Sequence, residues 1–533
     1  MNRTKAENSV SQCSTTSSNC TTSPSKIMDE HFICTLFNLN PSDVFHIQCI
    51  RDATDGHTSV NLTLNPTYPP CPQCGEPQPK IKDYYTRKIN HAVLNDSHTV
   101  LYLRDRRYMC RHCHKTYFAQ NPLKEDFFQH SLLTTKLILQ ELKDPNMTMA
   151  AVARKYHLST TTIANIFDAH VDIGRKTLPR FLCIDEVYAF RSKKSKYVCV
   201  LLDYKNKSPI DILPSRTYED LARFFSAIPK EERDKVSVFS TDMWDAYRNI
   251  AKQYLPNSCI VVDHFHIIQE CHKRLDRIRL NIQKTFPKGS QEYYLLKKFH
   301  WVLFKNHSEL LDENRKKQYN KKMKRYLNYH DIKCLLQDTH QELEMAVNLK
   351  DALCMYYDTI KIIEADDNPN YQEEVPKLTL KANGKATTRS YKLHSEASKR
   401  NSRRVMTREE AKTELEQLIT KFRDCPLIEF SSFASTMNSW KEEIVNSLQI
   451  YMELDRKRVS NSIIENRNKI IKNVKRTANG YGNWRRFRNR LMYTLNPDST
   501  YSIMADEMVI DHKRKMNKQH YLEWKKKHGK DSV

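Results

Sequence analysis

Three acidic residues occupy positions that suit ligands of a divalent metal ion: Asp185 in FLCIDEVYAF, Asp242 in VSVFSTDMW and Glu465 in NSIIENRNKIIK. The first two end apolar, β-branched segments, which predict buried strands, and the third lies near the start of an amphipathic helix. Carboxylate oxygens are hard ligands that suit Mg2+ or Mn2+. Two such ions, roughly 3.5 to 4 Å apart, can hold and neutralise a phosphodiester during its cleavage. The three acids therefore predict a two-metal site for phosphodiester chemistry.

The segments around the two aspartates predict the sheet that would position them. Five short apolar segments are typical of strands, and helices are expected at about 217–227 and 244–254; the strand segments are 181–190, 196–204, 208–213, 236–242 and 259–265. Three antiparallel strands followed by alternating helices and strands is the order of a ribonuclease-H-like fold. In that topology the first and fourth strands are neighbours, so Asp185 and Asp242 should meet at one edge of the sheet.

Other acids near these strands are weaker candidates. Glu186 follows Asp185 on a strand, so it should point to the opposite face. Asp203 and Asp211 lie on strands with no matching motif, and all three are left out of the predicted site.

The segment VVDHFHII offers a further acid and two histidines. Asp263 also ends a strand, but the position of VSVFSTD as the fourth strand favours Asp242 instead. His264 and His266 either line the site or contact DNA, or they are packed structural histidines. The sequence leaves these alternatives open.

The helix that carries Glu465 has two distinct faces. Positions 4, 7 and 11 residues further on are Lys469, Lys472 and Arg476, so the carboxylate heads a basic stripe. Apolar residues line the other side: Ile463, Ile470 and Val474. A helix packed through its isoleucines would present one acid and three cations to the same groove, although an ordinary solvent-exposed charged face has the same pattern.

A long segment separates this helix from the predicted strands. Residues 272–455 are helical in period and rich in charge, which predicts an all-α insertion that interrupts the sheet domain. Within it, residues 379–404 contain eight Lys or Arg and one acid, Glu396. This basic loop is either a solvated linker or a DNA contact.

Four cysteines predict a structural zinc site. Two C-x-x-C knuckles, CPQCGEP and CRHCHK, contain Cys71, Cys74, Cys110 and Cys113. Four thiolates with this spacing close a tetrahedral site that holds one Zn2+ and leaves no open position for catalysis. The alternative is a coincidental group of reduced cysteines.

Residues 148–167 have the apolar spacing of a helix-turn-helix: Val152, Ala153, Tyr156, Leu158, Ile163 and Ile166. Ser159 is a suitable N-cap for the second helix. That helix would direct four side chains toward a DNA major groove, namely Thr160, Thr161, Thr162 and Asn165. His157 occupies the turn position that often holds glycine, and any amphipathic helical hairpin could show this spacing.

Composition indicates the partner and the compartment. The 533 residues exceed the size of one core, so several domains are expected, and a net charge of +24 favours nucleic acid as the partner, with an anionic membrane surface second. No apolar run approaches the roughly 20 residues needed to span a bilayer, and the first residues lack the apolar core of a signal peptide. Fifteen cysteines, an odd number, are expected to be reduced. We therefore expect a cytoplasmic protein, associated with the nucleoid if prokaryotic.

These motifs, in this order, resemble the ISL-three group of DDE insertion-sequence transposases. The resemblance rests on the knuckles, the helix-turn-helix, and the segments IDE, TDMWDAY, VVDHFHII and SIIENRNKIIKNVKR, and it runs over most of residues 34–497. It implies that Asp185, Asp242 and Glu465 match the DDE triad of the family. We expect Asp185 to bridge two Mg2+ or Mn2+ ions, with Asp242 on one ion and Glu465 on the other.

The resemblance also implies the reaction and the partners. The expected function is a DNA transposase that binds element ends as a homo-oligomer on double-stranded DNA, cleaves a strand and joins it to target DNA. The alternatives are a transposase-derived DNA-binding regulator without catalysis and a ribonuclease-H-like nuclease without strand transfer.

The expected fold is a multidomain α+β protein with seven parts. They are a disordered tail (1–30), an N-terminal region (31–125) with the zinc ribbon at about 67–118, a helix-turn-helix domain (126–177), the first part of the catalytic domain (178–271), the insertion (272–455), the closing part of the catalytic domain with the Glu465 helix (456–497), and a basic C-terminal tail (498–533).

Overall fold

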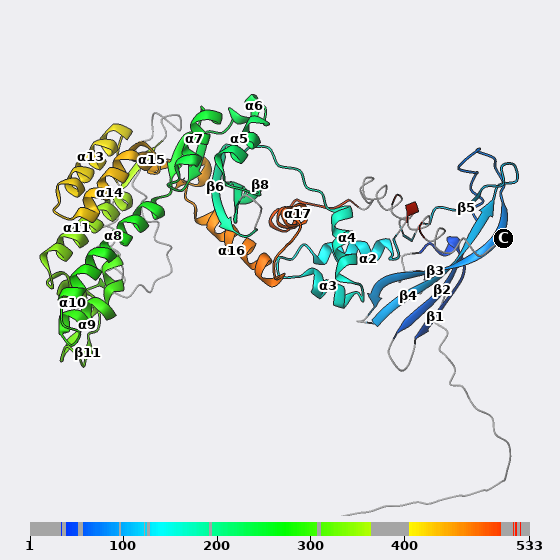
Figure 1. The fold of residues 1–533 in the computed structure, drawn as a ribbon, viewed down its shortest axis with the longest axis horizontal. Coiled ribbons are helices and arrows are strands. Elements are labelled where there is room, and N and C mark those ends of the chain that lie inside the picture. The colour runs from blue at the N-terminus through cyan, green and yellow to red at the C-terminus, as the bar shows by residue number, and fades with distance from the viewer. Residues whose placement is uncertain are drawn as a thin grey trace, which may run out of the picture. The chain divides into compact units, whose positions relative to one another are not determined.

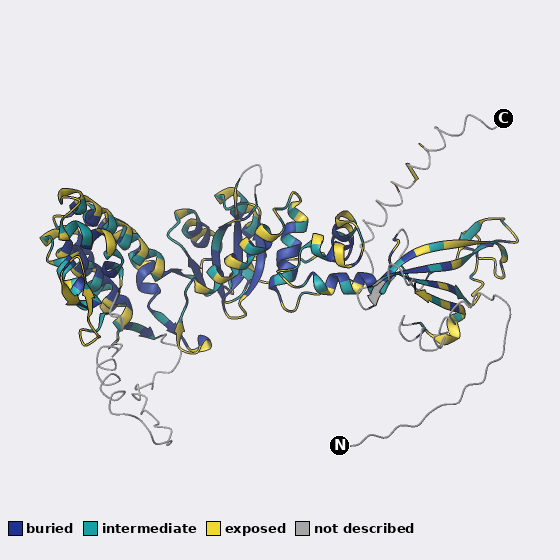
Figure 2. Ribbon diagram, turned by 90° about the horizontal axis from the view of Figure 1, so that it is seen from below, coloured by how far each residue is buried: buried dark blue, intermediate teal, exposed yellow. Residues whose placement is uncertain are grey.

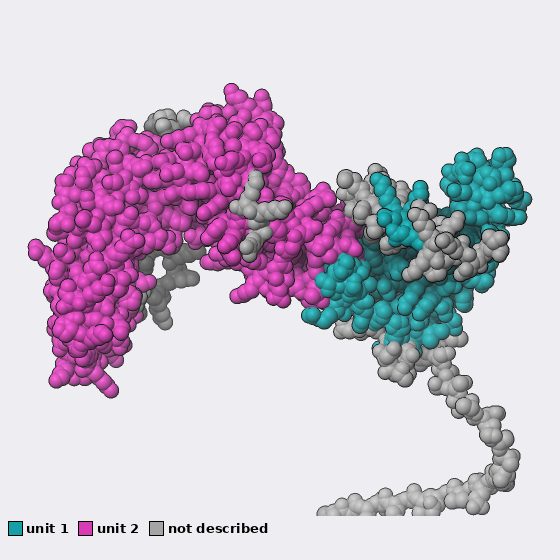
Figure 3. Space-filling view, in the orientation of Figure 1, with its two compact units in different colours: residues 1–140, 152–163, 503–533 teal, residues 141–151, 164–502 magenta. Residues whose placement is uncertain are grey.

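The computed structural model forms two compact units, drawn in different colours in Figure 3. Unit 1 contains residues 1–140, 152–163 and 503–533, and unit 2 contains residues 141–151 and 164–502. The structure describes residues 39–502 together with positions 34, 515, 518, 519 and 523, with gaps at 52–56, 95–96, 122, 125–127, 191–194, 306–310 and 364–403. The predicted disordered tail, all of the basic loop except Arg404, and most of the predicted C-terminal tail lie outside the described residues.

Unit 1 is built on a twisted sheet (Figure 1) with strand order β1-β2-β4-β3, and β5 pairs with β4. Its strands are β1 (Val44–Arg51), β2 (Thr58–Leu64), β3 (Lys80–Leu94), β4 (Ser97–Met109) and β5 (Thr116–Phe118), preceded by the short 3-10 helix η1 (Pro41–Asp43). Alternate apolar side chains of these strands, such as Val60, Ile89 and Leu101, are fully buried in one small core. The long β3–β4 pair is antiparallel and carries the cysteine knuckles just outside its open ends.

The predicted helix-turn-helix is present as α3 (Met149–Lys155) and α4 (Thr160–His170), after α2 (Leu132–Glu141). The Ser159 Oγ accepts a hydrogen bond from the Thr162 backbone N–H at 3.0 Å, which confirms the predicted N-cap. His157 has φ +51°, so the turn adopts the left-handed conformation that glycine usually supplies. The apolar residues predicted from the spacing are buried, apart from Leu158, which is half-buried.

Unit 2 contains the predicted sheet, with strand order β10-β9-β6-β7-β8. Strands β6 (Phe181–Tyr188), β7 (Tyr197–Asp203) and β8 (Ser208–Leu213) are antiparallel, whereas β9 (Val238–Thr241) and β10 (Cys259–Val262) run parallel to β6. The first and fourth strands, β6 and β9, are therefore neighbours, as predicted. Helices α5 (Tyr218–Ser226), α6 (Lys230–Arg233) and α7 (Asp245–Tyr254) lie between the strands in sequence.

The two faces of this sheet bury different helices. Phe181, Cys183 and Val187 pack with residues of α16 (Ser462–Thr477) and α17 (Trp484–Leu495), whereas Leu182 and Ile184 pack with residues of α5 and α7. The alternation follows from the two-residue period of a strand. The sheet is thus covered on both sides, which fits its continuous apolar strands.

The buried stripe of α16 differs from the predicted one. Ile464, Ile471 and Val474 are buried, together with Asn468, whereas Ile463 and Ile470 are only partly buried. Ile463 and Ile470 are seven residues apart, as are Ile464 and Ile471, so either pair could lie in the buried stripe of a helix. Packing against the sheet buries Ile464 and Ile471.

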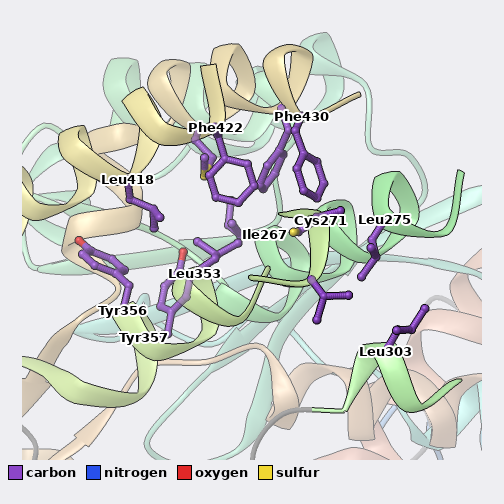
Figure 4. Packing of buried hydrophobic residues seen from close by; sticks show 14 of the residues in the cluster. Ile267, Cys271, Leu275, Leu303, Leu353, Tyr356, Tyr357, Leu418, Phe422 and Phe430 are labelled. Atoms are coloured by element: carbon purple, nitrogen blue, oxygen red, sulfur yellow. The ribbon is translucent and has the colours of Figure 1, made fainter. Parts of the chain in front are cut away.

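The segment between β10 and α16 folds mainly as helices around a large core of described residues, whose close packing Figure 4 shows. Ile267 and Cys271 from one helix meet Leu353 and Phe422 from others there. The helices are α8 (His264–Thr285), α9 (Gln291–Lys298), η2 (His300–Phe304), α10 (Tyr329–Gln337), α11 (Gln341–Thr359), α13 (Arg408–Asp424), α14 (Ile428–Ser439), α15 (Lys441–Asn446) and η5 (Met452–Leu454).

The prediction of an all-α insertion is wrong. A hairpin joins β11 (Gln318–Asn320) to β12 (Arg325–Leu327), and a second small sheet has the order β14-β13-β15-β16. Its strands are β13 (Ile360–Ile363), β14 (Arg404–Val405), β15 (Gln449–Tyr451) and β16 (Lys457–Arg458). The β-branched IKII segment pairs with residues about 90 positions away, and periodicity cannot reveal such a pairing.

The predicted boundary at residue 271 also falls inside a helix, since α8 runs without a break from His264 to Thr285. The start of α8 lies beside the sheet, and its buried apolar residues from Ile267 to Ile282 belong to the core of the helical region. In Figure 2 the burial colours alternate along the helices, as expected of helices with one face in a core. Among the helices that the structure describes, none is long and apolar enough to cross a bilayer.

Candidate active site

Asp185 and Asp242 lie side by side where β9 ends next to its longer parallel neighbour β6. The register of β6 and β9 pairs Cys183 with Ser240, so the two aspartates follow at equivalent positions two residues further on. One carboxylate oxygen from each lies within 4.8 Å of the other and of an oxygen of Glu186. Three carboxylates therefore gather at the sheet edge that the sequence predicts.

Glu186 joins this group although its backbone position faces the opposite side of the sheet. Its carboxylate accepts hydrogen bonds from the Arg216 guanidinium and, at 3.3 Å, from the Tyr247 hydroxyl. The strand β9 ends at Thr241, so the longer glutamate side chain can reach past the sheet edge toward the aspartates. The alternation of side chains along a strand predicts the face to which Glu186 points, but it does not predict how far the side chain extends beyond the sheet. The available signal was the presence of two consecutive acids in one strand, Asp185 and Glu186.

Arg216 is held firmly beside this group. Its guanidinium carbon lies 4.6 Å from the centroid of the Tyr197 ring and 4.7 Å from that of Trp244. Cation–π contacts on two rings, together with the ion pair to Glu186, restrict the arginine to one position. The arginine neutralises part of the local negative charge.

Glu465 belongs to a second group with Asp263 and His266, whose ligand atoms lie within 4.8 Å of one another. Asp263 is the N-cap of α8, where its Oδ1 accepts from the Phe265 backbone N–H at 3.3 Å. Its Oδ2 accepts from the backbone N–H of Asn461, just before α16, at 3.2 Å. One buried carboxylate thus ties the starts of α8 and α16 together and sets the position of Glu465.

The electrostatic environment of Asp185, Glu186 and Asp242 favours binding of a cation. Burial, together with the charges of Glu186, Asp242 and Glu465, raises the pKa of Asp185 to about 7, although a hydrogen bond from the Glu186 backbone N–H acts in the opposite direction. Burial, followed by the Glu186 charge, raises the pKa of Asp242 to about 6, although His266 and Arg216 act in the opposite direction. A bound divalent ion would relieve this repulsion and desolvation.

Two buried polar atoms also lack partners among the described residues, Asp242 Oδ1 and His266 Nε2. Buried polar atoms are nearly always paired, so both atoms fit a role as metal ligands. The oxygen-rich donors fit Mg2+ or Mn2+, and an imidazole suits Mn2+ better than Mg2+.

The remaining candidates in the sheet have structural partners. Asp203 accepts from the backbone and side chain of Asn206 in a turn, and Asp211 is paired with Arg488 at 2.7 Å. His264 lies 3.2 Å from Asp263 through its Nδ1. These contacts explain the first two acids without a role in the site.

The four knuckle cysteines converge as a zinc site requires. Sγ–Sγ distances are 3.6 Å for Cys71–Cys113 and Cys74–Cys110, and 3.5 Å for Cys74–Cys113. Four sulfurs about 2.3 Å from a central ion would be about 3.8 Å apart, so the group is close to a tetrahedral Zn2+ shell. Both knuckles turn through a left-handed residue, Gly75 with φ +73° and His114 with φ +56°.

The predicted DNA-contacting residues differ in their exposure to solvent. Thr160, Thr161 and Asn165 are exposed on α4, whereas Thr162 is half-buried with its hydroxyl 2.8 Å from Ser159 Oγ. On α16 the three predicted cations are exposed: Lys469, Lys472 and Arg476.

Four arginines of α17 are engaged within unit 2 instead. Arg486 forms a bidentate pair with Asp168, and Arg485 pairs with Asp172 at 3.0 Å. Arg488 pairs with Asp211, and the buried Arg490 donates to the backbone oxygens of residues 144 and 147. The guanidinium groups of α17 therefore hold neighbouring segments of unit 2.

A cysteine ribbon, a helix-turn-helix and a sheet domain with clustered carboxylates define a protein of the transposase class. Three family models match the chain: a zinc finger of the transposases IS204, IS1001, IS1096 and IS1165 over residues 67–113, a helix-turn-helix domain of transposase family ISL3 over residues 120–171, and the ISL3 transposase DDE domain over residues 182–491. The chain belongs to the ISL3 family of transposases.

One curated relative agrees with this assignment. The transposase for insertion sequence element IS1001 from Bordetella parapertussis is 22% identical over 273 residues. The match covers 50% of this chain and 66% of that protein, slightly less than two thirds of its length.

Proposed function

We propose that this chain is a DNA transposase that binds insertion-sequence ends and catalyses metal-dependent strand cleavage and strand transfer. The observation that carries the proposal is the pair of adjoining ligand groups, Asp185–Glu186–Asp242 and Asp263–His266–Glu465. The strand order β10-β9-β6-β7-β8 supports a ribonuclease-H-like catalytic domain, interrupted between β10 and α16 by the mainly helical region.

The two groups support a two-ion site built on the DDE triad. Asp185 would lie between the ions, Asp242 and Glu186 would hold one, and Glu465 with Asp263 and His266 would hold the other. Such ions supply charge neutralisation on the phosphoryl oxygens and lower the pKa of an attacking hydroxyl. Asn468 and Arg216 keep the carboxylates in place, through a hydrogen bond to Asp185 and an ion pair to Glu186.

The reaction itself would occur in two displacements at phosphorus. In the first, water forms the new P–O bond at the element end, and the 3′ oxygen leaves and takes up a proton. In the second, that 3′ hydroxyl attacks a phosphodiester of target DNA, so that one P–O bond forms as another breaks. No oxidant or nucleotide cofactor is required.

The DNA-binding parts of the proposal rest on α4 and α16. Thr160, Thr161 and Asn165 have the exposure needed to reach base edges in a major groove. Lys469 and Lys472 follow Glu465 on the same helix and would bind phosphates near the scissile bond. We propose that the protein acts on double-stranded DNA as a homo-oligomer, so that two element ends can be processed together.

Purified protein incubated with Mg2+ and DNA carrying the element ends tests the proposal. We expect nicking at the ends followed by joining to target DNA. Binding without nicking would instead indicate a DNA-binding regulator, and nicking without joining would indicate a nuclease that lacks strand transfer. A protein that neither binds nor cuts these ends would refute the proposal.

A further inference from the structure

A basic hairpin in the helical region is left unexplained by the proposed active site and end-binding modules. Residues 315–327, RKKQYNKKMKRYL, contain seven Lys or Arg and no Asp or Glu. Strands β11 and β12 pair antiparallel, with Tyr319 opposite Tyr326, and residues 321–324 form the turn between them. We call residues 315–327 the basic hairpin.

The basic hairpin is anchored to the core of the helical region and to α10. Met323 in the turn is only 6% exposed and belongs to the core of the helical region. Asn320 Oδ1 accepts from the backbone N–H groups of Lys322 at 3.1 Å and Met323 at 3.2 Å, which closes the turn. Lys317 pairs with Asp331 of α10 at 3.0 Å. The turn therefore presents its lysines in a defined position.

The cations at the tip have no protein counterions among the residues that the structure describes. Five of them are exposed and make no side-chain ion pair or hydrogen bond with described residues: Lys316, Lys321, Lys322, Lys324 and Arg325. The arginines of α17, by contrast, are paired with aspartates or backbone oxygens. Like charges concentrated in one short turn repel each other, and a polyanion would relieve that repulsion.

Two exposed aromatic rings accompany this charge. Tyr319 is 55% exposed and Tyr326 is 67% exposed, and their ring centroids lie 5.2 Å apart. The rings cover one face of the pair and stiffen the hairpin through their mutual contact. A two-stranded ribbon of this kind is narrow enough to enter a DNA major groove.

We propose that the basic hairpin binds the phosphate backbone of duplex DNA away from the cleavage site. Figure 1 shows β11 at the end of the helical region that is remote from β6. Helix α8 begins beside the active site and shares the core of the helical region with Met323 and Leu327 of the hairpin. DNA bound at the hairpin would therefore be DNA outside the cleavage site.

The test replaces the tip charges and measures binding at several salt concentrations. The variant Lys321→Gln/Lys322→Gln/Lys324→Gln of the full chain is titrated with a 40-base-pair duplex of arbitrary sequence, without added Mg2+. Each lost phosphate contact should lower the slope of log Kd against log [NaCl] by about 0.9, so the expected decrease is about 2 to 3. The substituted side chains are exposed, and the melting temperature should not change.

A matched control separates local contact from net charge. Lys230, Lys235 and Lys252 are also exposed, and replacing all three by Gln removes the same charge from α6 and α7 and their surroundings. We expect the control to keep the wild-type slope and the arginine variant Lys321→Arg/Lys322→Arg/Lys324→Arg to retain binding. An equal change in control and hairpin variants, or no change in either, would overturn the proposal.

A 30-nucleotide single strand distinguishes the form of DNA that is bound. A larger loss of affinity for the single strand than for the duplex would assign the hairpin to unpaired bases and would also overturn the proposal. The inference relies on the proposed function only in taking DNA as the partner. Because the assay needs neither metal nor cleavage, its failure would leave the proposed active site untouched.

Discussion

The Asn468 side chain donates a hydrogen bond from Nδ2 to Asp185 Oδ2 at 2.8 Å, and it thereby joins α16 to β6. Asn468 lies three residues after Glu465 on the buried side of the helix. Its Oδ1 has no partner among the described residues. This single amide therefore couples the strand that carries one acid of the predicted triad to the helix that carries another.

Replacing Asn468 by Ala should weaken catalysis through Asp185. The carboxylate would lose a donor that fixes its orientation, and loss of such supporting contacts typically costs 10- to 100-fold in metal affinity or activity. We expect about that decrease in the Mg2+-dependent cleavage rate, with a higher Mg2+ requirement and unchanged end binding. Asn473→Ala, on the same helix, is the control, and equal losses in both variants would contradict the positioning role.

The triad itself should be indispensable for cleavage. Asp185→Asn, Asp242→Asn and Glu465→Gln each remove one anionic ligand with little change of shape. Metal stabilisation of the transition state is worth several kcal/mol, so cleavage should fall on the order of 10³-fold or more. Gel-shift measurements should show nearly intact end binding. Any of the three variants that still cleaves at the wild-type rate would remove that residue from the site.

His266 should distinguish Mn2+ from Mg2+. His266 lies in the group with Asp263 and Glu465, and its Nε2 has no partner among the described residues. Imidazole binds Mn2+ more readily than Mg2+. In His266→Ala, the Mn2+ affinity measured by paramagnetic resonance of free Mn2+ should fall about tenfold, with a smaller effect on Mg2+. His46→Ala, at an exposed position of β1, is the control. An unchanged Mn2+ titration in His266→Ala would exclude the histidine as a ligand.

The knuckle cysteines should hold one zinc ion per chain. Metal analysis of the purified protein should give about one equivalent, and Cys110→Ser should lose it, because a tetrahedral site needs all four thiolates. Cys334→Ser, at an exposed cysteine outside the knuckles, should retain the metal. Finding a folded ribbon without zinc would show that the four sulfurs serve another purpose.

Unit 1 should lose stability in mild acid because of His91. Burial lowers the pKa of this imidazole to about 4, and its Nδ1 lies 2.9 Å from Ser131 Oγ. In the unfolded chain its pKa is about 6.5, so the unfolded state binds more protons between these values. The contribution is complete above pH 6.5 and is lost as the pH falls to about 4, by up to about 3 kcal/mol. Hydrogen exchange of the β3–β4 amides measures the stability of unit 1 at each pH. In His91→Gln, this stability should depend less on pH.

Much of the sheet domain could be predicted from the residues alone. Its five strands are short apolar runs bounded by polar or turn residues, and their sequence order already limits the topology, so Asp185 and Asp242 were expected together. The helix-turn-helix and the knuckles were predictable for the same reason, since spacing within about 20 residues determines their geometry.

Longer-range features escaped this reasoning. Glu186 was left out because alternation assigns a side chain to a face but says nothing of how far it reaches past a sheet edge. The small strands β13 and β15 were missed because their hydrogen-bond partners are distant in sequence. The aspartate partners of the α17 arginines lie more than 270 residues earlier in the chain, so no local pattern indicates these ion pairs.

The order of residues thus specifies which donor atoms the protein possesses and which local elements carry them, because helix and strand periods and turn preferences act over a few residues. Which atoms meet is a different matter. Glu465 lies beside Asp263 and His266 because Ile464 and Ile471 pack on the sheet and set the rotation of α16, while Asp263 binds the backbone of Asn461. Such contacts join segments about 200 residues apart, so their geometry arises from packing of the whole domain and is absent from any local pattern.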